Sequence, residues 1–112
     1  MSQITTHVLD TSEGKPAEGI KIELQKPSGS SWETLAEGIT NSDGRIADLL
    51  GKGEALAPGI YRMHFHTSAD FKGLGIKSFY PEVSIVFETF DESHYHVPLL
   101  LNPFGYSTYR GS

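Results

Sequence analysis

The feature that most constrains this chain is a repeated alternation of apolar and polar residues, interrupted at short intervals by turn-forming residues. In residues 20–25, three aliphatic residues alternate with lysine, glutamate and glutamine. Successive side chains on a β-strand point to opposite faces, so this period of two is typical of a strand with one buried and one wet face. Short strands of this kind, closed by frequent turns, indicate an all-β sandwich or barrel.

The alternation predicts roughly eight short strands and one helix. The expected strands lie at residues 4–11, 20–25, 32–37, 45–50, 59–67, 82–90, 94–101 and 104–111. The segment SADFKGLG, which begins at Ser68, has a serine suited to the N-cap, an aspartate in the first turn and glycines that end a helix. We expect residues 1–112 to form one domain, close to the common domain size but small enough that oligomerisation would help its stability.

Composition excludes several classes of protein. Nine lysines and arginines against fourteen acidic residues give a net charge of −5, which supplies no basic footprint for nucleic acid. The absence of cysteine excludes disulfides, a cysteine nucleophile and cysteine-ligated metal. No apolar stretch is long enough to span a bilayer, and the first residues lack the basic start and apolar run from which a signal peptide would be expected. We therefore expect a cytoplasmic protein with neither a nucleic-acid nor a membrane partner.

Histidine is the residue type most able to carry chemistry here. Four of the five histidines form two H-x-H pairs, HFH at 64–66 and HYH at 94–96, and each pair would present two imidazoles on one strand face. That arrangement suits a zinc ion, a general base near neutral pH, or simply a polar strand face. His7, which lies between Thr6 and Val8, would be structural if judged by its surroundings alone. Spacing does not decide among these alternatives, because a metal site also needs a third ligand and supporting outer contacts.

Arginine is scarce, with only Arg45, Arg62 and Arg110 in the chain. Arg45 follows the turn NSDG, where a guanidinium held at a strand end could bind a planar, polar ligand, although a surface ion pair is an equal alternative. The sequence lacks a glycine-rich phosphate loop, a G-x-S-x-G elbow and an H-E-x-x-H helix.

Several stretches together resemble the 5-hydroxyisourate hydrolases, the enzymatic branch of the transthyretin-like family. They are THVLDTSEGKPAEGIKIEL, NSDGR, GIYRMHFHT, FYPEVSIVF and HYHVPLLLNPFGYSTYRGS, which follow one another in the family's order over essentially the whole chain. The terminal Y-R-G-S tetrapeptide is the most specific of these motifs. Hormone-carrying transthyretins share the fold but lack Y-R-G-S and the histidine pair of the enzymes.

The resemblance implies a two-sheet antiparallel β-sandwich of eight strands with one short helix. It implies a homotetramer, a dimer of dimers, with active sites in clefts along the dimer–dimer channel. The implied substrate is 5-hydroxyisourate, the unstable product of urate oxidation in purine degradation. The implied reaction adds water across a ring amide to give 2-oxo-4-hydroxy-4-carboxy-5-ureidoimidazoline, without a metal or an organic cofactor.

The resemblance also implies the site residues. The two catalytic histidines fall on His7 and His96, and the catalytic arginine falls on Arg45. The substrate-binding set adds the terminal motif: Tyr109, Arg110, Gly111 and Ser112. His64, His66 and His94 do not match motif residues and receive no catalytic role, although His94 is expected to share a strand face with His96.

These residue types fit a ring-opening hydrolysis. A neutral imidazole can accept a proton from water, a second imidazole can orient it or pass protons on, and a guanidinium can stabilise developing negative charge. The sequence leaves open which histidine is the base. Two other hypotheses remain: a transthyretin-like carrier of a small molecule without catalysis, and a metal-dependent hydrolase that uses the two H-x-H pairs.

Overall fold

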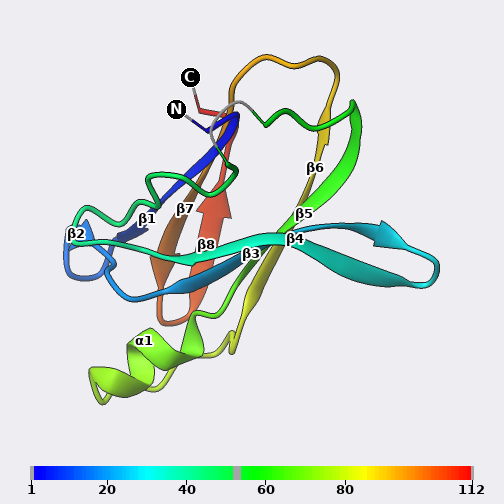
Figure 1. Ribbon diagram of the computed structural model, residues 1–112. Helices are drawn as coiled ribbons and strands as arrows, with labels where there is room; N and C mark the ends of the chain where they lie inside the picture. The colour runs from blue at the N-terminus through cyan, green and yellow to red at the C-terminus, as the bar shows by residue number, and fades with distance from the viewer. Residues whose placement is uncertain (1, 52–53, 112) are drawn as a thin grey trace.

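The computed structural model describes residues 2–51 and 54–111, in which two four-stranded sheets pack face to face (Figure 1). The first sheet has the order β2-β1-β7-β8 and the second has the order β4-β3-β5-β6. The elements are β1 (Ile4–Asp10), β2 (Lys15–Pro16), β3 (Lys21–Ser28), β4 (Ser31–Ile39), β5 (Gly59–Phe65), α1 (Ser68–Gly73), β6 (Val83–Thr89), β7 (Tyr95–Asn102) and β8 (Gly105–Thr108). The structure confirms the all-β sandwich with one short helix.

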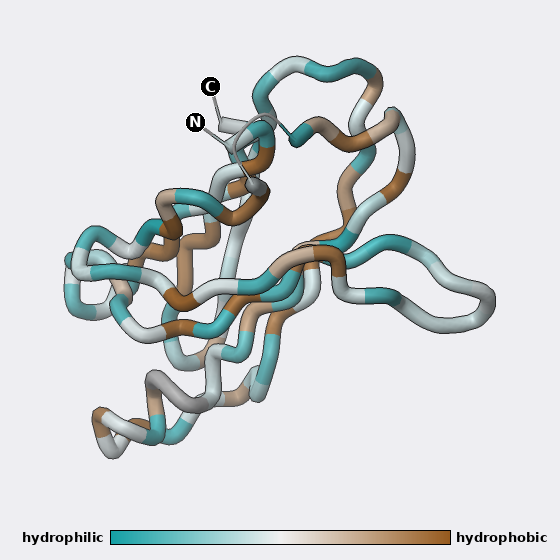
Figure 2. Tube along the Cα trace, viewed as in Figure 1, coloured by the Kyte–Doolittle hydropathy of each residue, from teal (hydrophilic) through white to brown (hydrophobic). Residues whose placement is uncertain are grey.

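The core lies between the two sheets, and most of its strand residues come from β1, β3, β5, β6 and β7. On β3, Ile22 and Leu24 are fully buried, whereas Lys21, the first residue of the strand, is exposed and Glu23 is half-buried on the opposite face. The other large, fully buried side chains include Ile4, Val8, Met63, Phe65, Phe71, Leu99 and Leu101. Figure 2 shows hydrophobic residues recurring along the packed strands, while the β3–β4 hairpin that projects from the sandwich is mostly hydrophilic or neutral.

One strand pair departs from the antiparallel arrangement expected for the whole sandwich. β1 pairs with β7 in parallel, in a register that places Thr5 opposite His96 and His7 opposite Pro98. Parallel neighbours cannot be joined by a tight hairpin, and these two strands come from distant parts of the chain. This pairing places His7 and His96 on neighbouring strands of the same sheet.

The expected strand at residues 45–50 was wrong. Only Arg45 makes a β-bridge, to His7, and the residues after it form turns. Leu49 and Leu50 are both buried, which does not fit alternation, and the Leu50 N–H donates to the Ser2 hydroxyl instead of a strand (3.1 Å). The eighth strand is instead β2, whose two residues lie outside every strand expected from the sequence.

Two exposed edges carry apolar side chains. β6 ends one sheet and β8 ends the other. Val86 on β6 is 57% exposed, and Tyr106 on β8 is 42% exposed. Within the described residues no helix combines the length and the apolar character needed to cross a membrane.

Candidate functional site

A pocket of about 460 Å³ lies on the outer face of the first sheet, where three separate parts of the chain meet. It is lined by Thr5, Thr6, Asn41, Arg45, Ile46, Ala47, His94 and His96. The lining therefore comes from β1, from the turn and loop at residues 41–47, and from the start of β7. Two of the sequence-predicted catalytic residues, Arg45 and His96, face this one pocket.

The NSDGR turn fixes Arg45 beside His7. The Asn41 side-chain oxygen accepts the backbone N–H groups of Asp43 (2.9 Å) and Arg45 (3.1 Å), which is the local bonding that favours asparagine in turns. Gly44 has a φ of 73°, and its carbonyl accepts the Val8 N–H at 2.9 Å. A Cβ on Gly44 would collide with the Val8 carbonyl oxygen, so only glycine lets the turn approach β1 this closely.

The same contact brings the backbone of Arg45 against that of His7 as an isolated antiparallel bridge. His7 is not among the residues that line the pocket, but it lies beside one that does. The predicted catalytic triad of His7, Arg45 and His96 thus gathers at one place, from positions spread along the chain.

A hydroxyl group joins the two histidines of the HYH motif. Thr5 Oγ1 lies 2.8 Å from His94 Nε2 and 2.8 Å from His96 Nδ1. A hydroxyl carries one proton, so Thr5 can donate to one ring and accept from the other. When His96 donates its Nδ1–H to Thr5, its Nε2 keeps a free lone pair and can act as a base.

Both predicted catalytic histidines are held toward the neutral form. Burial lowers the pKa of His7 below its usual value of 6.5, and the Arg45 guanidinium lowers it further, against an opposing influence of Asp43. Burial is also the main cause that lowers the pKa of His96, followed by Arg45 and then by His94 and His7. A neutral imidazole is the form that accepts a proton, so both groups suit general-base chemistry at neutral pH.

The terminal motif reaches this site through its backbone. The Gly111 N–H donates to the His96 carbonyl at 2.9 Å, and a Cβ on Gly111 would overlap the His96 ring. Arg110 instead lies over the Tyr95 ring, 4.3 Å from its centroid, and Tyr109 is 59% exposed. Ser112 lies outside the described residues. The structure therefore brings Gly111 to His96 but does not bring the side chains of Tyr109 and Arg110 into the pocket of this single chain.

The sequence analysis missed several lining residues, of which Thr5 and Asn41 are the polar ones that act on the predicted site residues. Thr5 precedes His7 by two positions and so shares its strand face, a signal that could have been used. Asn41 was assigned only to a turn, and nothing local marks it as a residue that lines the pocket.

The two H-x-H pairs cannot form one centre. His64 is near the end of β5 in the second sheet and His66 directly follows that strand, whereas His96 is near the start of β7 in the first sheet and His94 directly precedes it. A metal-dependent hydrolase built from both pairs is therefore inconsistent with the fold.

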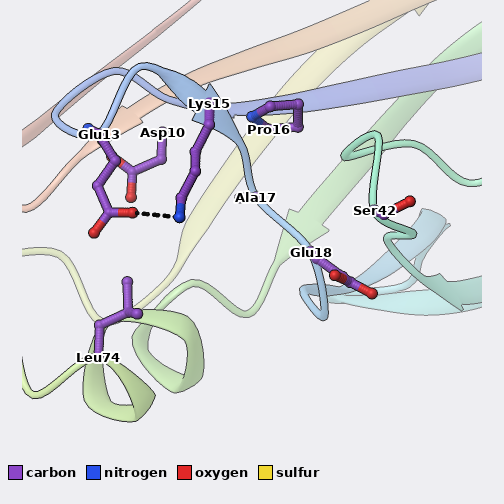
Figure 3. Close-up of a pocket in the computed structure, with 8 residues that line it drawn as sticks. All are labelled: Asp10, Glu13, Lys15, Pro16, Ala17, Glu18, Ser42 and Leu74. Carbon is purple, nitrogen blue, oxygen red and sulfur yellow. Dashed lines mark hydrogen bonds and ion pairs between the residues drawn. The ribbon is translucent and has the colours of Figure 1, made fainter.

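A second depression lies near β2 and is less suited to this chemistry (Figure 3). Its charged side chains include Lys15, whose ammonium lies 3.2 Å from the Glu13 carboxylate, an exposed pair of small energetic consequence. No histidine or arginine lines it.

Known proteins resemble this chain over nearly its full length. A protein of Rhizobium meliloti named 5-hydroxyisourate hydrolase 2 is 46% identical, covering 98% of this chain and 96% of the relative. The structure of Klebsiella pneumoniae 5-hydroxyisourate hydrolase has a TM-score of 0.84 and 40% identity, covering 97% of this chain and 92% of that one. Sea bream transthyretin, solved in complex with thyroxine, has a TM-score of 0.89 but 28% identity, covering 97% and 94%.

The backbone alone does not separate the hydrolase from the hormone carrier, since both superimpose well. Sequence identity is higher for the hydrolases, and residues 4–111 match the HIUase/Transthyretin family. The chain therefore belongs to the HIUase/transthyretin family.

Proposed function

We propose that this protein is a 5-hydroxyisourate hydrolase, which opens the six-membered ring of 5-hydroxyisourate to 2-oxo-4-hydroxy-4-carboxy-5-ureidoimidazoline. The observation that carries the proposal is a pocket lined by Arg45 and His96, with His7 bridged to Arg45 beside it and the pKa of both imidazoles lowered. Relatives named for this activity, at 41–46% identity over nearly the whole chain, support it.

The reaction needs a base for water and a cation for the developing oxyanion. Water attacks the ring carbonyl, a C–O bond forms, and the water proton passes to a neutral imidazole. The C–N bond of the ring amide then breaks, and the proton is delivered to the departing nitrogen. His7 and His96 are the groups that can accept and return this proton, and Arg45 can bind the ureide oxygens and stabilise the negative charge.

The site of a single chain is an open pocket, which suits completion by a second copy. We infer that the chain forms a homotetramer, as the family resemblance implies, with the pocket in the channel between dimers. The exposed strand edges β6 and β8, with Val86 and Tyr106 on them, are the surfaces available for such pairing. There the side chains of Tyr109 and Arg110 would come to substrate bound in a neighbouring pocket. We further propose a cytoplasmic place in urate degradation.

The direct test mixes the protein with freshly generated 5-hydroxyisourate and follows the loss of its ultraviolet absorbance against the spontaneous rate. We expect clear acceleration and a single product enantiomer. His7→Asn and His96→Asn should each lower the rate by roughly 10²–10⁴-fold, the usual contribution of general-base catalysis. Near-normal turnover by both variants would refute the assignment.

A transthyretin-like carrier is the second candidate, favoured by the superposition on sea bream transthyretin. It predicts saturable binding of a small aromatic ligand and no acceleration of ring opening. The fold does not choose between the two, because function depends on the residues of the site.

A further inference from the structure

Three side chains gather on the opposite outer face of the sandwich, away from the pocket of His7 and His96. Glu23 on β3 pairs directly across from His64 on β5, and His66 follows two positions later on the same face. His64 and His66 pack edge to face, with ring centroids 4.7 Å apart. Neither histidine has a part in the hydrolysis proposed above.

We propose that Glu23, His64 and His66 form a binding site for a divalent transition-metal ion, with zinc the best fit. One donor atom from each residue lies within 4.8 Å of the other two. Zinc bonds to imidazole nitrogen and carboxylate oxygen are about 2.0–2.2 Å long, which puts tetrahedral ligands about 3.4 Å apart. His66 Nε2 and Glu23 Oε2 are now 2.6 Å apart, so they must separate by less than about 1 Å as the ion replaces their shared proton.

Contacts around the cluster already orient its ligand atoms. Ser84, across from His64 on β6, has its Oγ 2.7 Å from His64 Nδ1, which leaves Nε2 as the nitrogen for a metal. The Thr34 hydroxyl donates to Glu23 Oε1 at 3.0 Å, which leaves Oε2 for the same purpose. Metal-binding histidines and carboxylates usually have outer partners of this kind.

The chemistry of the donors selects the class of ion. Two imidazoles and a carboxylate suit zinc and its neighbours, whereas magnesium and calcium prefer oxygen ligands. Glu82 Oε2 lies 3.5 Å from His64 Nε2 on a side chain that is 59% exposed, so it or water can take the fourth position. The His64 side chain is 11% exposed and that of His66 is 37% exposed, so an ion can enter from solvent.

An ion here would join β3 to β5 rather than take part in the reaction. The simpler alternative is that the cluster is only a hydrogen-bonded His66–Glu23 pair with a neighbouring imidazole. Measurements of metal binding distinguish the metal site from this alternative, because a hydrogen-bonded pair needs no metal ion.

The test titrates metal-free, chelator-treated protein with cobalt(II) and then displaces it with zinc. We expect one ion per chain, visible absorption bands of tetrahedral cobalt, and a higher melting temperature with zinc. His64→Gln combined with His66→Gln should abolish this binding, and Ser84→Ala should weaken it about 10–100-fold. Ser84→Ala leaves every ligand in place and so keeps the test informative if the double variant does not fold.

The matched control is His7→Gln with His96→Gln, which removes two imidazoles from the other face and should leave this binding unchanged. The proposal is overturned if the wild-type protein takes up no stoichiometric cobalt, or if the His64/His66 variant binds it as the wild type does. Loss of binding in the His7/His96 control instead would place the ion in the pocket and also overturn it. None of these readouts depends on hydrolysis.

Discussion

Thr5 illustrates how a single side chain organises this site. Its hydroxyl bridges the rings of His94 and His96, and its one proton links their tautomers. Thr5 lies opposite His96 in the β1–β7 register, so the contact follows directly from strand pairing. The Thr5 hydroxyl can in this way decide which nitrogen of His96 is free to accept a proton.

The pH dependence of the reaction follows from the lowered pKa values of His7 and His96. Each must be neutral to accept a proton, and each is neutral further into the acid range than an ordinary histidine of pKa 6.5. We therefore expect the acid limb of the rate of enzymatic ring opening to be centred below pH 6.5. A pH–rate profile, corrected for spontaneous decay, checks this. An acid limb centred above 6.5 would contradict it.

Gly111 should be intolerant of even the smallest side chain. A methyl group there would overlap the His96 ring, and displacement of a catalytic group by about 1 Å can cost on the order of 10²-fold in rate. We expect Gly111→Ala to lose activity at that level while its thermal unfolding stays close to wild type. Gly73→Ala is the matched control, because a Cβ at Gly73 meets nothing within 4 Å. Equal activity of the two variants would show that the contact has no catalytic importance.

At the scale of elements, the segment after β8 leaves the regular pairing of the sheet and contacts the candidate site. The β7–β8 ladder ends with the pairing of Leu99 and Thr108, and beyond it only Gly111 returns to His96. Of the described residues after β8, Tyr109 and Arg110 are exposed, and none of 109–111 belongs to the buried core.

Removal of residues 109–112 should therefore leave a folded protein that has lost most of its activity. Circular dichroism and thermal unfolding would report the fold, and the ultraviolet assay would report turnover. A truncated protein with normal turnover would show that the Y-R-G-S motif is dispensable. A truncated protein that fails to fold would show that the segment supports the sandwich.

Alternation along the chain predicted strands such as β1 and β3 because each of these buries one face. Ile22 and Leu24 face the core and Glu23 faces outward, as the pattern of β3 implies. The alternation failed to predict secondary structure where tertiary contacts determine the backbone conformation. Lys15 and Pro16 form a strand only by pairing with Asp10 and Leu9, and neither has a local signal for it.

For the site too, some residues could be named from the sequence, whereas their arrangement depends on the fold. His7, Arg45 and His96 were named from a family resemblance, and only the fold places them together, through a parallel strand pair and a glycine turn. No local pattern predicts that Asn41 lines the pocket, because its position depends on the approach of Gly44 to β1.

At the scale of the whole molecule, association is the feature most open to measurement. The exposed edges β6 and β8 and the apolar residues on them favour pairing with further copies. We expect light scattering to give a mass about four times the 12.3 kDa of one chain.

Val86→Lys should weaken the assembly by placing a charge on the β6 edge, whereas Glu88→Lys at an already charged position on the same strand serves as control. A monomeric wild-type protein with full activity would contradict the proposed tetramer.

The parallel pairing of β1 with β7 also has a consequence for biosynthesis. The Thr6 hydroxyl donates to the Val97 carbonyl across 91 positions of sequence, and every residue of β1 pairs with a residue of β7. On a ribosome, the first strand made must wait until nearly all of the chain has emerged before its partner exists, and such distant pairings also close slowly. During that interval its open edge can pair with strands of neighbouring nascent chains. Exchange of β1 between copies on one messenger RNA is thus the characteristic misfolding hazard of this topology.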